Sequence, residues 1–192
     1  IMQLFSIGLW ELNQNGTRKL DADGQFIPTY TNADIDEFAQ VFTGLSDGSE
    51  EGDFFNELEA FSLTVPMKMY DEYHDMSEKK LLNGLVLPAN QSGVEDINQT
   101  LIHLTTHPNT APFIAKALIQ FLTTSNPSPA YVKAVADEFN ALEDNNLQRV
   151  ISAILLHPEA RSCYISPSYT FGKLREPVVR LMNFYKAFQI TP

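Results

Sequence analysis

The sequence predicts a mainly α-helical domain that carries one or two small β-hairpins. Apolar residues recur at helical spacing through most of the chain after Gly93, and residues suited to cap helices precede these stretches. Before Gly93, short apolar stretches alternate with Asn-Gly and Asp-Gly pairs, which are typical of tight hairpin turns. A chain of 192 residues that is 44% hydrophobic can bury a substantial core, so we expect 1–192 to form a single domain.

The composition excludes several classes of protein. The chain has 24 acidic and 13 basic side chains, which gives a formal net charge of −11. Nucleic-acid binding needs Lys and Arg to neutralise phosphates, so we expect no nucleic-acid partner. One cysteine excludes an internal disulfide framework, and no apolar run is long enough to predict a transmembrane segment. The composition does not predict an oligomeric state.

The first segment predicts a helix followed by a small β-meander. Ile1, Leu4 and Phe5 follow helical spacing, and no capping residue precedes them. We therefore expect this helix to begin upstream and the chain to be a fragment truncated at its N-terminus. Asn15-Gly16 and Asp23-Gly24 then predict two tight turns, because both central residues of such a turn take positive φ.

A second helix and a second hairpin are predicted before Gly93. Thr31 can cap a helix, with Asp34 at the capping-box position, and Gly44 can end it. Two short segments rich in Val, Leu, Met and Tyr follow, at 63–75 and 79–87. We expect these two segments to pair with each other as a hairpin.

The rest of the chain predicts a series of helices. Their expected ranges are 93–106, 110–123, 129–142, 146–156 and 174–188. Suitable N-cap residues are Ser92, Asn109, Ser128 and Asn145 or Asn146. Two of the helix ends share a His-Pro pair, at His107 and at His157, which predicts that the chain turns there.

Five segments follow one another in a distinctive order. They contain Ile1-Met2-Gln3-Leu4-Phe5, Thr43-Gly44, Tyr73-His74-Asp75, His107-Pro108-Asn109-Thr110-Ala111 and Arg175-Glu176-Pro177. This ordered set resembles the bacterial family catalogued as domain of unknown function 1800. Members of that family are usually longer, so the resemblance implies that this chain is a C-terminal part. It also implies export to a periplasmic or extracellular location, with a second exported protein as the expected partner, and it implies no particular activity.

The adjacent His74 and Asp75 form the polar pair that best suits chemistry. A histidine beside a carboxylate can act as a general base or as a metal ligand. With Lys79, they are the candidate catalytic residues. Neighbouring side chains of a strand point to opposite faces, however, so the alternative is that Asp75 fixes a turn with Lys79 as its charge partner.

A divalent metal is the candidate cofactor. His74 and Asp75 could supply two ligands, and His103 and His107 have the i, i+4 spacing that places two ligands on one helix face. Leu104 stands where the zinc-protease motif has its general-base Glu, and His107 can instead end the helix. At each of these two pairs, a metal site and a purely structural role therefore remain the two alternatives.

A candidate binding surface lies near the last predicted helix. Tyr164, Tyr169 and Phe171 occupy a loop rich in Ser, Pro and Gly, and Arg175 follows them. These side chains could bind a partner, or the aromatic rings could pack in the core.

Two functions follow from these observations. The first is a non-catalytic binding or interaction module of an exported bacterial protein. The second is a hydrolase-type or metal-dependent enzyme centred on His74 and Asp75. An enzyme should gather its polar groups in one concave pocket, whereas an interaction module should expose an apolar surface.

Overall fold

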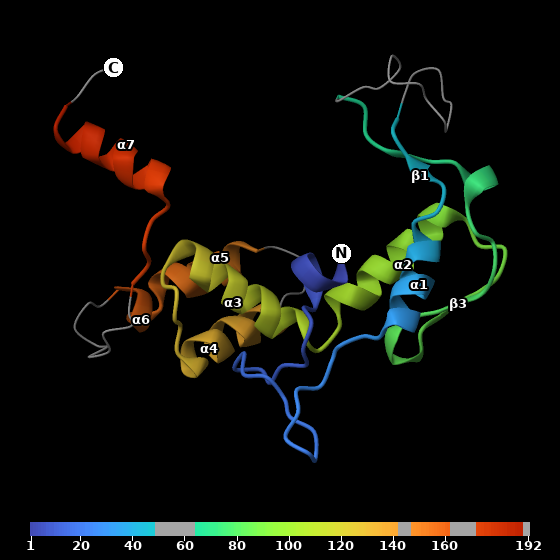
Figure 1. Cartoon of the computed structure of the whole chain (residues 1–192), viewed down its shortest axis with the longest axis horizontal. Coiled ribbons are helices and arrows are strands. Elements are labelled where there is room, and N and C mark those ends of the chain that lie inside the picture. Colours follow the sequence, from blue (N-terminus) through green and yellow to red (C-terminus); the bar gives the residue numbers. More distant parts are fainter. Residues whose placement is uncertain (49–63, 142–146, 162–171, 190–192) are drawn as a thin grey trace. The chain divides into compact units, whose positions relative to one another are not determined.

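The chain is described by a computed structural model, shown in Figure 1. The described residues are 1–48, 64–141, 147–161 and 172–189. Helices dominate this part of the chain, and its named strands form two antiparallel two-stranded sheets. The predicted mainly α-helical class with small hairpins is therefore confirmed. Within these residues no helix combines the length and the apolar character needed to cross a bilayer.

The chain forms two compact units. Unit 1 comprises 1–11 and 20–110, and unit 2 comprises 12–19 and 111–192. By sequence, unit 1 holds 18 acidic and 3 basic side chains, which gives a net charge of −15. Unit 2 holds 6 acidic and 10 basic side chains, which gives +4. The acidic character of the protein is thus a property of one unit.

Unit 1 is built from short helices around one apolar core. The helices are η1 (Met2–Ser6), α1 (Asn32–Val41), η2 (Asp71–Tyr73), η3 (Leu82–Gly84) and α2 (Gly93–Thr105). The core residues are Met2, Ile7, Phe38, Val41, Leu81, Leu82, Leu87 and Leu104. Helix α1 begins at the predicted capping box, in which Asp34 Oδ2 accepts from Thr31 N at 2.6 Å and Thr31 Oγ1 accepts from Asp34 N at 3.4 Å.

The predicted pairing of 63–75 with 79–87 is wrong. Strand β2 (Lys68–Met69) pairs with β1 (Leu45–Ser46), and β3 (Lys79–Lys80) pairs with β4 (Val86–Leu87). The turn between β3 and β4 contains Asn83-Gly84, with φ of 55° and 79°. This is the same Asn-Gly signal as in the first hairpin, and it closes a local pairing in preference to a more distant one.

The first segment differs from the predicted helix. It forms one turn of π-helix, in which the N–H groups of Ile7 and Gly8 both donate to Met2 O. This turn buries Met2 and Ile7, whereas Leu4 and Phe5 are exposed. The helical spacing was therefore detected correctly, but the face that enters the core is a different one.

The predicted meander is present as isolated bridges. Leu12 pairs with Arg18 across Asn15-Gly16, Leu20 pairs with Phe26 across Asp23-Gly24, and Trp10 pairs with Pro28. Gly16 and Gly24 both have positive φ, at 75° and 76°. Turns thus form at both predicted places, but Asn15 and Asp23 are not among the residues with positive φ, so the prediction that both central residues take positive φ is wrong.

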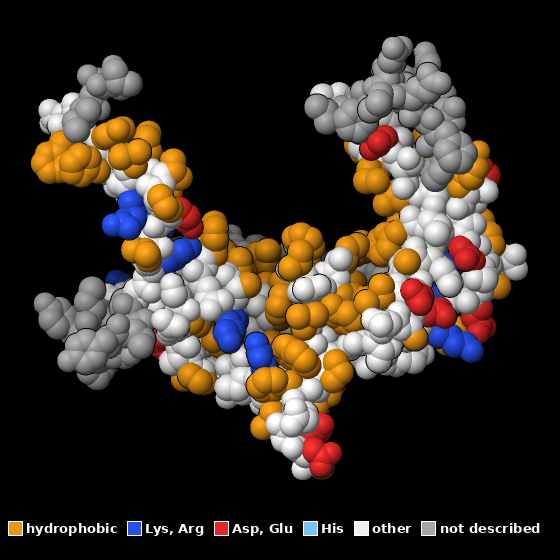
Figure 2. All heavy atoms as spheres, in the orientation of Figure 1, with side chains coloured by type: hydrophobic (Ala, Val, Ile, Leu, Met, Phe, Trp, Pro, Cys, Tyr) orange, Lys and Arg blue, Asp and Glu red, His pale blue; other side chains and the backbone are white. Residues whose placement is uncertain are grey.

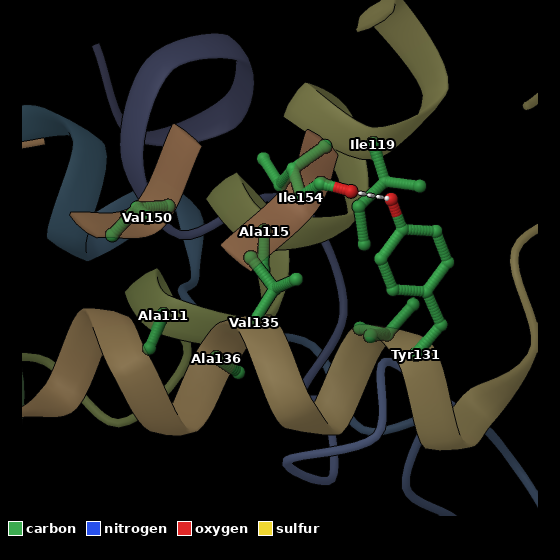
Figure 3. Packing of buried hydrophobic residues seen from close by; sticks show 9 residues of the cluster. Ala111, Ala115, Ile119, Tyr131, Val135, Ala136, Val150 and Ile154 are labelled. Carbon is green, nitrogen blue, oxygen red and sulfur yellow. Dashed lines mark hydrogen bonds between the residues drawn. The ribbon is translucent and has the colours of Figure 1, made fainter. Parts of the chain in front are cut away.

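Unit 2 is a group of helices with its own core. The helices are α3 (Thr110–Leu122), α4 (Pro129–Asn140), α5 (Gln148–Leu156), α6 (Pro158–Arg161) and α7 (Pro177–Ala187). Figure 3 shows the core, in which the Tyr131 hydroxyl donates to Ile154 O at 2.6 Å. Burial raises the pKa of Tyr131. Ser128 caps α4 as predicted, and α7 buries no side chain.

Both His-Pro pairs turn the chain in the same way. His107 Nδ1 accepts from Asn109 N at 3.1 Å, and His157 Nδ1 accepts from Glu159 N at 3.2 Å. Each ring thereby satisfies a backbone N–H at the start of the following helix. Asn109, the predicted N-cap of α3, donates from its side-chain amide to Ile7 O at 2.6 Å and to Trp10 O at 2.9 Å.

The two hairpin glycines provide a matched pair of substitutions. A Cβ at Gly16 would lie 2.8 Å from Val132 Cγ1, whereas a Cβ at Gly24 would meet nothing within 4 Å. Gly24→Ala should lower the free energy of unfolding by about 1 kcal/mol, the cost of a left-handed backbone with a side chain. Gly16→Ala should lower it by roughly 2 to 4 kcal/mol, because the overlap adds to that cost. Urea unfolding of both variants measures the difference, and equal losses would contradict the packing of Gly16.

Candidate functional site

His74 lies at the centre of a buried polar cluster in unit 1. It follows η2, and its ring packs against the start of α2. This contact depends on Gly93, because a Cβ there would lie 2.5 Å from Met69 Sδ and 3.0 Å from His74 Nδ1. The absence of a side chain at Gly93 therefore lets the ring approach the helix.

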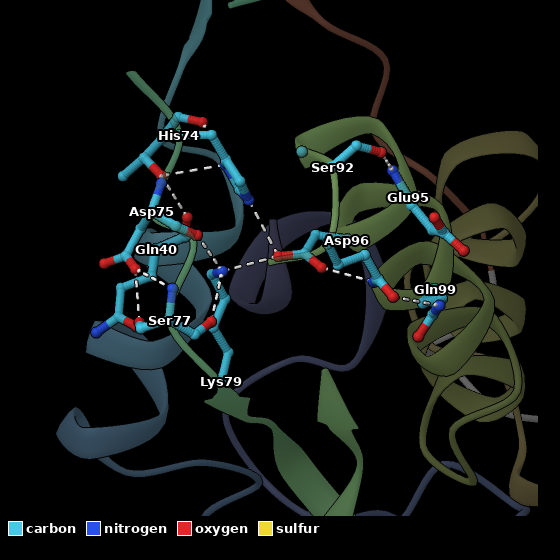
Figure 4. Close-up of polar contacts among 12 residues, drawn as sticks. Gln40, His74, Asp75, Ser77, Lys79, Ser92, Glu95, Asp96 and Gln99 are labelled. Atoms are coloured by element: carbon cyan, nitrogen blue, oxygen red, sulfur yellow. Dashed lines mark hydrogen bonds and ion pairs between the residues drawn. The ribbon is translucent and has the colours of Figure 1, made fainter. Parts of the chain in front are cut away.

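Both ring nitrogens of His74 have hydrogen-bond partners. Nε2 lies 3.1 Å from Asp96 Oδ2, and Nδ1 lies 2.8 Å from Thr43 O (Figure 4). Both partners are acceptors, and a histidine donates from both nitrogens only when the imidazole is protonated. The residue is 7% exposed. Both ring nitrogens of this buried histidine are therefore engaged by acceptors within the protein.

Lys79 is the basic side chain that pairs with Asp96 in the cluster. Its Nζ lies 2.8 Å from Asp96 Oδ2 and donates to Ser77 O at 3.1 Å and to Asp75 O. A lysine ammonium has three N–H donors, and these three acceptors use all of them. Lys79 is only 1% exposed, so its charge is neutralised inside the protein by Asp96. The predicted ion pair with the Asp75 side chain is replaced by this one.

Asp96 is the anion that joins the cluster, and it was not among the residues predicted from the sequence. It is 0% exposed, and its Oδ1 accepts from Gln91 Nε2 at 2.6 Å. Asp96, Thr100 and Leu104 are spaced i, i+4 and i+8 along α2, and all three are buried. A charged residue on the buried face of an amphipathic helix requires a partner, and this is the sequence signal that could have located it.

The cluster superficially resembles a catalytic triad. Thr43 Oγ1 lies 3.3 Å from His74 Nδ1, and Asp96 lies at the other ring nitrogen. The hydroxyl of Thr43, however, donates to Gln40 O at 2.6 Å and accepts from Asp75 N at 2.8 Å. The His74 and Asp96 side chains are 0% exposed, so a substrate cannot reach them in this conformation. The arrangement therefore fits a structural role better than nucleophilic catalysis.

Asp75 points away from His74 and closes a turn. Its Oδ1 accepts from Ser77 N at 2.8 Å and from Ser77 Oγ at 2.5 Å, as Figure 4 shows. The hydrogen bonds from Ser77, first from its side chain and then from its backbone, lower the pKa of Asp75. His74 and Asp75 therefore have separate roles in the structure. Asp75 fixes a turn, as the alternative prediction had it.

The two histidines of the second predicted metal pair, His103 and His107, differ in their hydrogen bonding. His107 Nδ1 accepts a backbone hydrogen bond, as described above, while His103 Nε2 is buried with no hydrogen-bond partner in the described part of the chain. Among the residues that the structure describes, no three His, Cys, Asp or Glu side chains are grouped to hold a metal ion. The candidate surface residues Tyr164, Tyr169 and Phe171 lie outside the described residues, and Arg175 is exposed.

Removing the charge of Asp96 tests the cluster. Asp96→Asn leaves the buried Lys79 ammonium without its anion, so the free energy of unfolding should fall by roughly 3 to 5 kcal/mol. Glu95→Gln is the matched control, because Glu95 is exposed on the same turn of α2, and it should change stability by less than about 1 kcal/mol. Urea unfolding measures both variants. Similar small losses of unfolding free energy in both variants would show that the cluster contributes little to stability.

The Asp75 turn predicts a pH dependence. Because the pKa of Asp75 is lower in the folded state than its ordinary value of 3.8, its stabilising effect is present above that value. The effect is lost as the pH falls through the folded pKa. Ser77→Ala removes the first cause of the shift, so the pKa of Asp75 should rise towards 3.8. Carboxyl NMR titration of both proteins measures this change, and an unchanged pKa would contradict the role of the Ser77 hydroxyl.

Comparison with known proteins gives a family and no function. No curated protein and no solved structure matches the chain significantly. The family model described as "Protein of unknown function (DUF1800)" matches residues 1–191, which is essentially the whole chain. This confirms the resemblance found from the ordered motifs, and the chain belongs to the DUF1800 family.

Proposed function

We propose that the chain is a non-catalytic interaction module that binds a second protein through unit 1. The observation that carries the proposal is an exposed apolar surface, here named the η1–α2 surface. It consists of Ile1, Leu4, Phe5, Leu101 and Ile102, all of which are exposed. Leu4 and Phe5 are 70% and 73% exposed, and groups of large apolar side chains on a surface mark interaction sites.

The η1–α2 surface has a rigid support. Elements η1 and α2 contact each other, and Met2 and Leu104 from these elements share one core. Asn109 follows α2, and its side chain donates to Ile7 O and Trp10 O. Helix α2 is itself held to β3 by the Asp96 ion pair with Lys79. A preorganised surface of this kind lowers the entropic cost of binding.

The charge of unit 1 indicates the chemistry of the partner. A net charge of −15 repels nucleic acids and anionic membranes from this unit. It favours a protein whose own apolar patch is bordered by Lys and Arg side chains, because complementary charge speeds and orients association. A second exported protein of this chemistry is the partner that we propose, and export of this chain belongs to the same proposal.

The cluster around His74 supports a non-catalytic module over the enzyme alternative. Its hydrogen bonds are made within the protein, and its side chains are inaccessible. A base or a metal ligand needs a free nitrogen that faces a substrate or an ion, and neither nitrogen of His74 is free.

A pair of matched double variants tests the interaction. A protein that the wild-type chain retains in a pull-down is identified by mass spectrometry and purified. Its Kd for the chain is then measured by calorimetry. Leu4→Glu/Phe5→Glu should weaken its Kd by at least about 30-fold, since central apolar residues of interfaces contribute about 2 kcal/mol or more. The control Leu20→Glu/Phe26→Glu changes another exposed Leu and Phe of unit 1 and should leave the Kd unchanged.

Two results would contradict the proposal. Equal binding by both double variants would exclude the η1–α2 surface. A saturable rise of Tm with one divalent metal, abolished by EDTA and by His74→Ala, would instead support the metal-dependent enzyme, because only ligands of the native state raise Tm.

A further inference from the structure

We propose that helix α7 binds the surface of an anionic lipid bilayer, lying flat in the interface. The helix spans Pro177–Ala187 and has no buried residue. Seven large apolar side chains on it or directly after it are exposed: Val178, Val179, Leu181, Met182, Phe184, Tyr185 and Phe188. Figure 2 shows apolar side chains along much of this helix. The inference concerns unit 2 alone and is independent of the proposed function.

The apolar side chains of α7 form one broad face. At about 100° per residue, all of them except Val179 fall within an arc of roughly 160°. The rings of Phe184 and Phe188 lie together on this face, with centroids 4.6 Å apart. By helical geometry, Asn183 lies on the opposite side. The helix is therefore amphipathic, although nothing in the described part of unit 2 covers its apolar face.

The charges of α7 and its approach match an anionic surface. Arg175, Arg180 and Lys186 are basic, and Glu176 is the single acidic residue between 172 and 189. By helical geometry, Arg180 and Lys186 border the apolar arc on its two sides. Long basic side chains in these positions can reach lipid phosphates while the apolar face enters the acyl region.

The width of the apolar face favours a bilayer over a protein groove. A helix that binds in a groove uses a stripe of residues at i, i+3/i+4 and i+7. The arc on α7 is wider, and its cationic borders suit a plane of phosphates. The base of the helix is anchored, because Gly172 N donates to Thr124 Oγ1 at 3.1 Å and Lys173 Nζ donates to Phe121 O at 2.7 Å. Helix α7 can thus meet a surface while unit 2 stays folded.

Vesicle flotation tests the inference. The full chain should bind vesicles of equal parts phosphatidylcholine and phosphatidylglycerol, bind pure phosphatidylcholine much more weakly, and lose binding as salt is added. Each basic residue near an anionic surface contributes about fivefold, so Arg180→Gln/Lys186→Gln should lower the partition coefficient roughly 30-fold. Phe184→Glu/Phe188→Glu should abolish binding to both kinds of vesicle.

The control pair lies on another helix of unit 2. Leu155→Glu/Leu156→Glu changes two exposed apolar residues of α5 and should leave vesicle binding intact. Circular dichroism without lipid checks that each variant folds, which is expected because α7 buries no side chain. Equal binding to both lipid compositions, or equal losses for the α5 and α7 variants, would overturn the inference. So would a dimer, seen by light scattering, that Phe184→Glu/Phe188→Glu dissociates in a protein that binds no vesicles.

Discussion

The ion pairs of Asp96 connect segments of unit 1 that are distant in the sequence. The carboxylate on α2 holds Lys79 on β3 and His74 after η2, and His74 in turn contacts Thr43 beyond the end of α1. Two of these segments are short, because strand β3 has two residues and η2 has three. A buried carboxylate beside a lysine and a histidine is stable only when each polar atom has a partner, and here the geometry provides the partners. The apolar η1–α2 surface rests on the helix that this network positions.

The local features of the fold were predictable from the sequence. The capping box of Thr31 and Asp34, the Ser92 and Ser128 caps and the Asn-Gly turn at residue 16 depend on residues close in sequence, whose chemistry acts over a single turn. The pairing of β2 with β1 was not predictable in this way. It connects residues more than 20 positions apart, and two-residue strands leave too short an alternation to set a register.

In the candidate site, too, the contacts between residues distant in the sequence were not predictable. His74 was identified as a histidine beside a carboxylate, Lys79 was identified as a possible charge partner, and the structure buries both. Their common partner was missed because Asp96 lies 22 positions after His74 in an otherwise ordinary helix. Asp75 was favoured as the partner by adjacency alone, yet a neighbouring residue on an extended chain points elsewhere. Only the amphipathic pattern of α2, with Asp96 on its buried face, contained the information.

The hairpin at residues 12–19 has a consequence for biosynthesis. It belongs to unit 2, where Gly16 approaches Val132 and Lys116 Nζ lies 3.5 Å from Gly16 O. The ribosome therefore makes this hairpin about 100 residues before the helices that it contacts, which at ~5–20 residues per second is a delay of roughly 5 to 20 s. Residues 20–110 of unit 1 are complete during that interval. Unit 1 can accordingly fold first, and the early hairpin waits exposed until α3 and α4 emerge.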